Sequence, residues 1–121
     1  EFPEAVTNGD KDKLYRMLSY FVANPKSAPM VLIIGSFYNH FNRIYQAHFL
    51  HGKPEKEQAA ALGTYPSRVR EIMSTAARWP LPKVEESLMI LGNYSTKTVG
   101  IDNTAGDTEL LKELVGRLES I

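Results

Sequence analysis

The sequence predicts an all-α protein, a single bundle of about six to seven helices around one long central helix. Apolar residues recur three or four positions apart in most segments, as on the buried face of a helix. No segment shows sustained period-two alternation of β-branched residues. The 121 residues suffice for one hydrophobic core and are too few for two. Residues 1–121 are therefore expected to form one domain.

Residues 28–52 are predicted to form the central helix. Pro29 suits a first helical position, and Gly52 suits the turn past a helix end. At 1.5 Å per residue the helix would be roughly 33–36 Å long. Two adjacent apolar stripes predict that it is covered from more than one side. The first stripe comprises Met30, Ile34, Phe37, Phe41, Ile44 and His48, and the second comprises Val31, Tyr38, Tyr45 and Phe49.

Caps, prolines and glycines delimit the other predicted helices. These helices cover residues 2–8, 11–24, 54–62, 66–78, 82–98 and 107–121, and Gly63 breaks the third of them. Asp10 offers an N-cap oxygen to the second of them. Tyr65 precedes Pro66 and is therefore biased away from helix, while Pro66 can open the next helix. Residues 100–106 (GIDNTAG) are the most loop-like passage in the chain.

Composition excludes several classes of function. Fourteen basic side chains balance fourteen acidic ones, so no global charge draws the chain to nucleic acid or acidic lipid. The absence of cysteine rules out disulfides and cysteine metal sites, and it fits a reducing compartment such as the cytoplasm. No apolar run approaches the ~20 residues of a membrane span, so no membrane partner is expected. The chain begins with Glu1 and not with Met, which indicates a fragment of a larger protein.

Motif searches predict no catalytic residue, no cofactor and no small-molecule substrate. The chain lacks the phosphate loop, the dinucleotide fingerprint, the nucleophile elbow and the H-E-x-x-H metal motif. His48 and His51 are three apart and could bind a metal together with Glu55, which would make the chain a metal-dependent enzyme. Without a third ligand at fixed spacing, an ordinary polar helix end is the preferred interpretation, and no metal is expected.

Residues 53–78, bounded by Lys53 and Arg78, resemble a helix-turn-helix unit. Its second helix would place Arg68 and Arg70, beside Ser67, where base contacts are usually made. The alternative function is therefore a DNA-binding regulatory domain. The next residue after Arg70 is acidic and the chain has no net positive charge, both of which count against that function. Helix pairs joined by a glycine turn are also common packing units.

The order of features along the chain resembles the C-terminal helical domain of the delta subunit of bacterial DNA polymerase III. The similarity runs through FPEAVTNGDKDKLYRMLSYFVANPKSAP, the aromatic helix MVLIIGSFYNHFNRIYQAH and EKEQAAALGTYPSRVREIMSTAARW. It continues through LPKVEESLMILGNYSTKTVG and TELLKELVGRLESI. The NPK step and FYNHFNRIY look most like Bacteroidetes sequences. Where the family commonly has Asp four residues before a lysine, this chain has Asn93 before Lys97, and the following glycine falls at Gly100.

The resemblance implies a collar domain that joins clamp-loader subunits into a ring and is not itself an enzyme. It implies that the partners are other clamp-loader subunits through the collar, with the sliding clamp and primed DNA contacted through the parent protein. Residues 53–78 would then serve collar packing. The candidate interface residues are aromatic side chains and one lysine, namely Tyr38, Tyr45, Trp79, Tyr94 and Lys97.

Overall fold

The computed structural model describes residues 2–24, 26, 29–99 and 106–121, and within these ranges it is built of α-helices without a strand. The all-α prediction is therefore confirmed for the described chain. The helices are α1 (Phe2–Thr7), α2 (Lys11–Ala23), α3 (Met30–Ala47), α4 (Glu55–Leu62), α5 (Pro66–Arg78), α6 (Leu81–Val99) and α7 (Gly106–Glu119).

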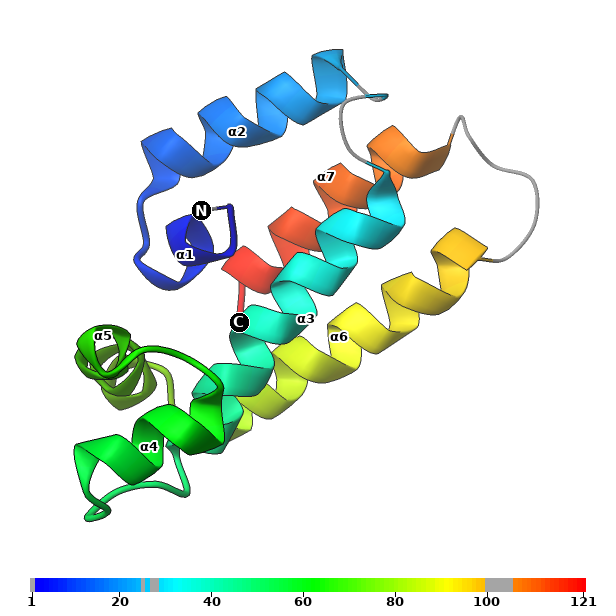
Figure 1. The fold of residues 1–121 in the computed structure, drawn as a ribbon. Coiled ribbons are helices and arrows are strands. Elements are labelled where there is room, and N and C mark those ends of the chain that lie inside the picture. The colour runs from blue at the N-terminus through cyan, green and yellow to red at the C-terminus, as the bar shows by residue number, and fades with distance from the viewer. Residues whose placement is uncertain (1, 25, 27–28, 100–105) are drawn as a thin grey trace.

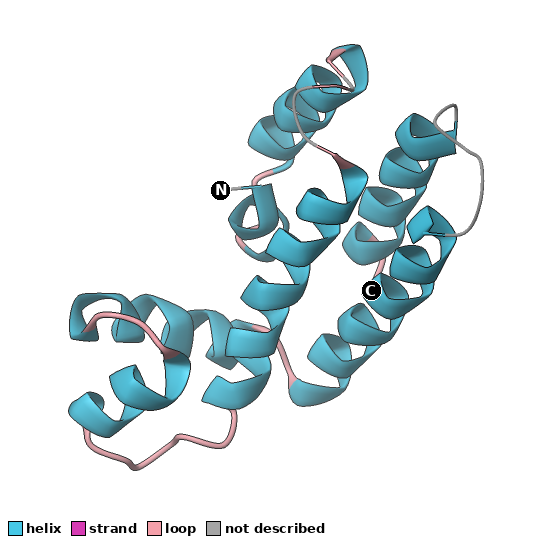
Figure 2. Ribbon diagram, turned by 45° about the vertical axis from the view of Figure 1, so that its right-hand side comes forward, coloured by secondary structure: helices cyan, strands magenta, loops and turns pink. Residues whose placement is uncertain are grey.

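Helix α3 is the centre of the arrangement, as predicted. It contacts α1, α4, α5 and α6, and its longest contact is with α6, which runs beside it (Figure 1). Helix α7 packs on α6, α1 and α2. The short pair α4 and α5 lies at one end of α3, and α2 lies toward the opposite end; short loops join most of these helices (Figure 2).

The first apolar stripe of α3 forms the middle of the core. Phe37, Phe41 and Ile44 are almost fully buried, and Phe41 lies 5.4 Å from the Trp79 ring between centroids. Helix α1 adds Phe2, whose ring lies 5.1 Å from that of Phe37. The residues before Gly9 are therefore an integral part of the core and not a loose terminal turn.

The predicted extent of the central helix was wrong at its C-terminal end. Helix α3 stops at Ala47 and has 18 residues, which corresponds to about 27 Å. The chain leaves the helix through tighter turns, in which Leu50 N donates to the Ala47 carbonyl at 3.1 Å. Leu50 is buried in the core, and the Gln58 side chain donates to its carbonyl at 2.9 Å. Gly52 adopts a positive φ of 81°, but in the turn that follows these residues.

Several predicted helix boundaries are confirmed. The Asp10 carboxylate accepts a hydrogen bond from Lys13 N at 3.1 Å and caps α2. Gly63 ends α4 with a φ of 64°, and Pro66 is the first residue of α5. The last helix begins at Gly106, one residue before the predicted start at Asp107. Residues 100–105 of the predicted loop lie outside the described chain.

Candidate subunit-interaction surface

The second stripe of α3 is exposed, which corrects the prediction that α3 is covered on both stripes. We call Val31, Tyr38, Tyr45 and Phe49 the α3 stripe. Tyr38 is 48% exposed and Phe49 is 58% exposed, whereas Tyr45 is half-buried. Helices α1, α4, α5 and α6 pack on α3 and bury its first stripe, whereas Val31 and Tyr38 of the second stripe stay exposed in the described structure. The apolar periodicity was read correctly, but within the described residues this stripe remains largely exposed.

The α3 stripe has the chemistry of a protein-binding surface. Gly35 and Asn42 occupy the positions between its members, so the stripe carries no charge along its length. Tyrosine rings are amphipathic and are enriched at protein interfaces. The Tyr45 and Phe49 rings meet edge to face at 5.2 Å, which restricts both side chains before any partner binds. Exposed apolar side chains that are aligned on one face indicate an interaction site, whereas the same number scattered singly over a surface is normal.

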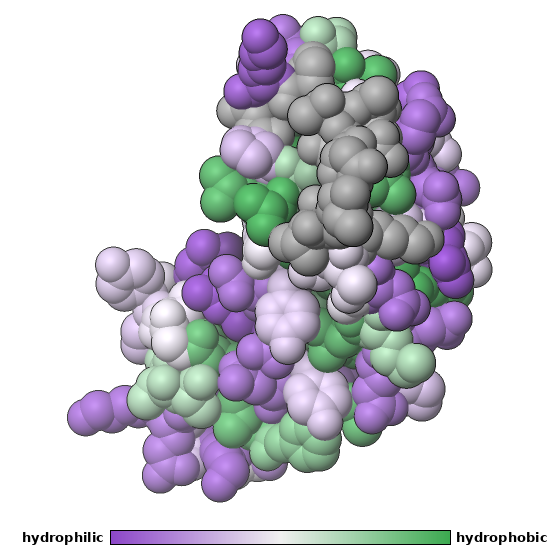
Figure 3. Space-filling model, turned by 90° about the vertical axis from the view of Figure 1, so that its right-hand side faces the viewer, coloured by the Kyte–Doolittle hydropathy of each residue, from purple (hydrophilic) through white to green (hydrophobic). Residues whose placement is uncertain are grey.

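Outside the stripe, the exposed large side chains of the described residues include the aliphatic Leu32 and the thioether Met89. Leu32 follows the first residue of the stripe on α3, and Met89 lies on the outer side of α6. The face in Figure 3 shows apolar side chains in small patches between polar ones and no continuous apolar sheet. The α3 stripe is a single row of side chains along α3 and the turn after it.

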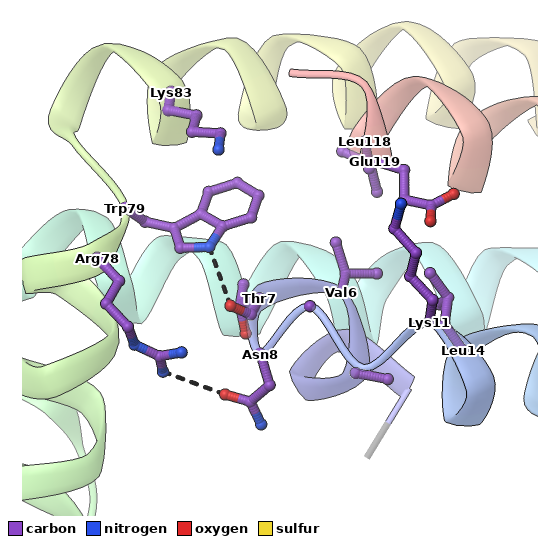
Figure 4. Close-up of a pocket in the computed structure, with 12 residues that line it drawn as sticks. Val6, Thr7, Asn8, Lys11, Leu14, Arg78, Trp79, Lys83, Leu118 and Glu119 are labelled. Carbon is purple, nitrogen blue, oxygen red and sulfur yellow. Dashed lines mark hydrogen bonds between the residues drawn. The ribbon is translucent and has the colours of Figure 1, made fainter.

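Trp79, one of the candidate interface residues, lies in the core. It is only 7% exposed, and its indole Nε1 donates to the Thr7 carbonyl at 3.1 Å. Lys83 covers one ring face with its amine 4.6 Å from the centroid (Figure 4). Trp79 thus joins α1 to the connection between α5 and α6, and its ring is not available as a surface anchor.

Tyr94 is also buried in the chain's own core. Its ring has no exposed surface, and its hydroxyl donates to the Glu113 carboxylate, which joins α6 to α7. The fifth candidate, Lys97, belongs to α6, but its side chain lies outside the described part of the structure. Of the five candidates, the structure therefore places only Tyr38 and Tyr45 on the surface stripe.

The predicted helix-turn-helix unit folds as two helices, α4 and α5, joined at Gly63. Both helices pack on α3 and on each other. Arg68 and Arg70 are exposed on α5, and Arg68 borders a small depression together with Glu71. Alternating charges around the start of α5 are typical of a solvated helix face. The pair of helices α4 and α5 is a packing unit of this bundle.

His40 is a residue that the sequence patterns did not single out, and it joins α3 to α1. Its Nε2 lies 3.0 Å from the Thr7 hydroxyl, and its Nδ1 lies 3.8 Å from a Glu4 carboxylate oxygen. Burial lowers the pKa of His40 from 6.5 to about 4, against the opposing effect of Glu4. The nearby charges of Arg43 and Arg68 lower it further. The imidazole is therefore neutral near neutral pH. The burial that causes this state is visible only in the folded structure, not in the sequence pattern.

The other two histidines do not meet at a shared site. His48 Nε2 is hydrogen-bonded to the Trp79 carbonyl at 2.7 Å, while His51 and Glu55 are exposed. In the part of the chain that the structure describes, no three histidine or carboxylate side chains come together as a metal site would require. None of the described helices combines the length and apolarity needed to cross a membrane.

Comparison with known proteins identifies the fold. No family model matches the chain, and no curated protein matches it. Among solved structures, the chain is similar to the DNA clamp loader delta protein of Bacillus subtilis (YqeN), with a TM-score of 0.83. The chain has a clamp-loader-like fold. The match covers 100% of this chain at 16% identity.

The match is limited to part of the Bacillus subtilis protein and to its fold. This chain spans 35% of the length of the Bacillus subtilis protein, so it corresponds to one part of that protein. At 16% identity the likeness concerns the fold alone, and the particular subunit and lineage predicted from the sequence go beyond it. The helix-turn-helix alternative receives no support from this comparison.

Proposed function

We propose that this chain is the collar domain of a clamp-loader delta subunit and supports sliding-clamp loading in bacterial DNA replication. The observation that carries the proposal is the fold match, which covers 100% of this chain and 35% of a clamp loader delta protein. The ordered sequence resemblance to the delta subunit of DNA polymerase III supports the same subunit. In this role the domain is an assembly module without catalysis of its own, and the parent protein contacts the sliding clamp and primed DNA.

The α3 stripe is the surface we assign to contact with other clamp-loader subunits. Tyr38 on α3 and Phe49 in the turn just after it expose about half of their side chains, and the stripe is uncharged. Burying such rings against a partner contributes on the order of 1.5–3 kcal/mol for each fully covered side chain. Tyr38 stands on a regular helix anchored by Phe37 and Phe41, and the Phe49 ring, in the turn after α3, packs against Tyr45, so both rings are restricted before binding.

The proposal is tested by mixing the full-length protein with the other clamp-loader subunits and analysing the mixture by size-exclusion chromatography. We expect co-elution of the wild-type protein. Tyr38→Arg should weaken the complex at least about tenfold, because it places a charge in the centre of an apolar contact. Failure of the folded wild-type protein to co-elute would overturn the proposed function.

Tyr65→Arg provides the matched control. Tyr65 is 75% exposed on the turn between α4 and α5 and is not a member of the α3 stripe. Its replacement should leave the complex intact, with circular dichroism showing that both variants are folded. Equal loss of binding in the two variants would contradict the assignment of the α3 stripe while leaving the proposed function standing.

A further inference from the structure

One face of α2 carries two basic residues followed by three large apolar or aromatic ones. Its members are one helical turn apart and form a single row, namely Lys13, Arg16, Met17, Tyr20 and Phe21. We call this row the α2 face. An open hollow of about 620 Å³ lies over it, and the residues that line the hollow are those of the α2 face. Because side chains three and four apart on a helix are neighbours, the row is one continuous surface.

The α2 face is left largely uncovered by the rest of the described chain. Helix α2 lies at the edge of the bundle, where its main contacts are with α1 and α7 (Figure 1). Leu14 is its one fully buried residue, whereas Tyr20 is 56% exposed and Phe21 is half-buried. The contact with α7 uses the other side of α2, where the Tyr15 hydroxyl donates to the Glu119 carboxylate at 2.9 Å.

The apolar end of the α2 face adjoins a second hollow. This hollow of about 190 Å³ lies between α1, α2 and α3, and its lining is apolar except for one serine. Phe21 lines both hollows, so they meet at its ring. Across the second hollow from α2 stands Leu32 of α3, which is 65% exposed. No member of the α3 stripe lines either hollow, so this surface is separate from the proposed subunit contact.

The aromatic side chains at this end are ordered by contacts within the fold. The Phe21 ring stacks on the Phe2 ring of α1, with 5.2 Å between centroids. The Tyr20 ring meets Phe21 edge to face at 5.6 Å. A partner that binds here therefore loses little free energy to the ordering of these rings.

The charge at the other end of the α2 face is positive. Arg16 is exposed, and its Nε donates to the Asp12 carbonyl oxygen at 3.4 Å. That bond leaves the two terminal nitrogens of the guanidinium group, which are suited to bidentate contact with a carboxylate. Among the described residues, no carboxylate forms an ion pair with Arg16. Lys13 adds a second positive charge one turn earlier on the same face.

We propose that the α2 face binds an acidic amphipathic helix of a partner protein. Carboxylates of that helix would lie at Arg16 and Lys13, and its aliphatic side chains would cover Tyr20 and Phe21. A helix fits better than an extended strand, because a strand must pair its backbone and the surface of α2 offers no free backbone edge. A positive end and an apolar end along one row favour an acidic and aliphatic partner over a purely charged one.

The test uses a synthetic peptide of about 14 residues, or roughly four helical turns. The peptide carries two Glu residues in its first half, Leu residues three and four apart in its second half, and Ala elsewhere to favour a helix. Its binding to the chain is measured at low salt by the fluorescence anisotropy of an attached dye. We expect saturable binding that weakens as salt is added. The same peptide with Lys in place of Glu should bind at least about tenfold more weakly.

Matched variants connect the binding to the α2 face. Arg16→Glu should weaken binding of the Glu peptide at least about tenfold and should strengthen binding of the Lys peptide, because the charge at the site is reversed. Tyr20→Ser should weaken binding of the Glu peptide at least about fivefold, since it removes an exposed aromatic ring. Arg70→Glu makes the same charge change at an exposed position of α5 and should bind as the wild type does. Circular dichroism checks that each variant is folded.

The proposal is overturned if the Glu peptide does not bind, if the Lys peptide binds the wild type equally well, or if Arg70→Glu loses as much affinity as Arg16→Glu. Sedimentation velocity of the chain alone tests a second copy as the occupant. Self-association that Arg16→Glu abolishes would assign the α2 face to that copy and would also overturn the proposal. None of these outcomes bears on the co-elution by which the proposed function is tested.

Discussion

Replacing His40 with Gln tests the buried junction between α1 and α3. The pKa of His40 is about 4 in the folded chain and 6.5 in its ordinary state, chiefly because burial disfavours the charged imidazole. The unfolded chain therefore binds more protons than the folded one between these values, and the free energy of unfolding falls as the pH is lowered through that window. For a shift of this size the loss between about pH 7 and about pH 5 is roughly 2 kcal/mol.

Urea denaturation followed by circular dichroism at a series of pH values measures this effect. Carboxylates also titrate toward the acid end, so the informative quantity is the difference between the wild type and His40→Gln. Gln cannot be protonated, so the variant should lose about 2 kcal/mol less over the same interval. His51→Gln is the matched control, because it removes an imidazole that is exposed to solvent. If wild type and His40→Gln show the same dependence on pH, the burial of His40 does not control acid stability and the reasoning is refuted.

Two further substitutions test contacts that position the helices. Trp79→Phe should lower the free energy of unfolding by about 1–3 kcal/mol, since the Thr7 carbonyl loses its buried indole donor; an unchanged urea midpoint would show that this bond contributes nothing. Asp10→Ala should cost about 1 kcal/mol by removing the N-cap oxygen that accepts from Lys13 N, while Asp10→Asn should retain most of the stability. Equal losses in the two Asp10 variants, measured by the same denaturation, would argue that capping is not the cause.

Local chemistry accounts for the parts of the fold that the sequence predicted well. Asp10 caps α2 because its carboxylate reaches the exposed N–H of Lys13 three residues on, a contact that needs no distant partner. Gly63 ends α4 because its backbone adopts a positive φ that other residues avoid. The buried stripe of Phe37, Phe41 and Ile44 follows from helical periodicity alone.

The incorrect predictions all concern how distant segments meet. The C-terminal end of α3 was placed too late because Leu50 leaves the helix to enter the core, and that depends on neighbours such as Gln58. The second stripe of α3 has the same periodicity as the first, so periodicity alone could not tell the covered face from the exposed one. Trp79 and Tyr94 looked like surface candidates, but Thr7 and Glu113 satisfy their polar atoms inside the fold.

The sequence by itself determined the helical class, most of the helix boundaries and the absence of known catalytic motifs, because these depend on spacing and on local backbone preference. Tertiary structure alone decided which aromatic residues are buried, that His40 meets Thr7, and that Lys11, Arg78 and Lys83 line one hollow. Those three cations are as far as 72 positions apart in the chain, so no local pattern relates them. They come to line the same hollow only because the folded core brings α2, α5 and α6 to it.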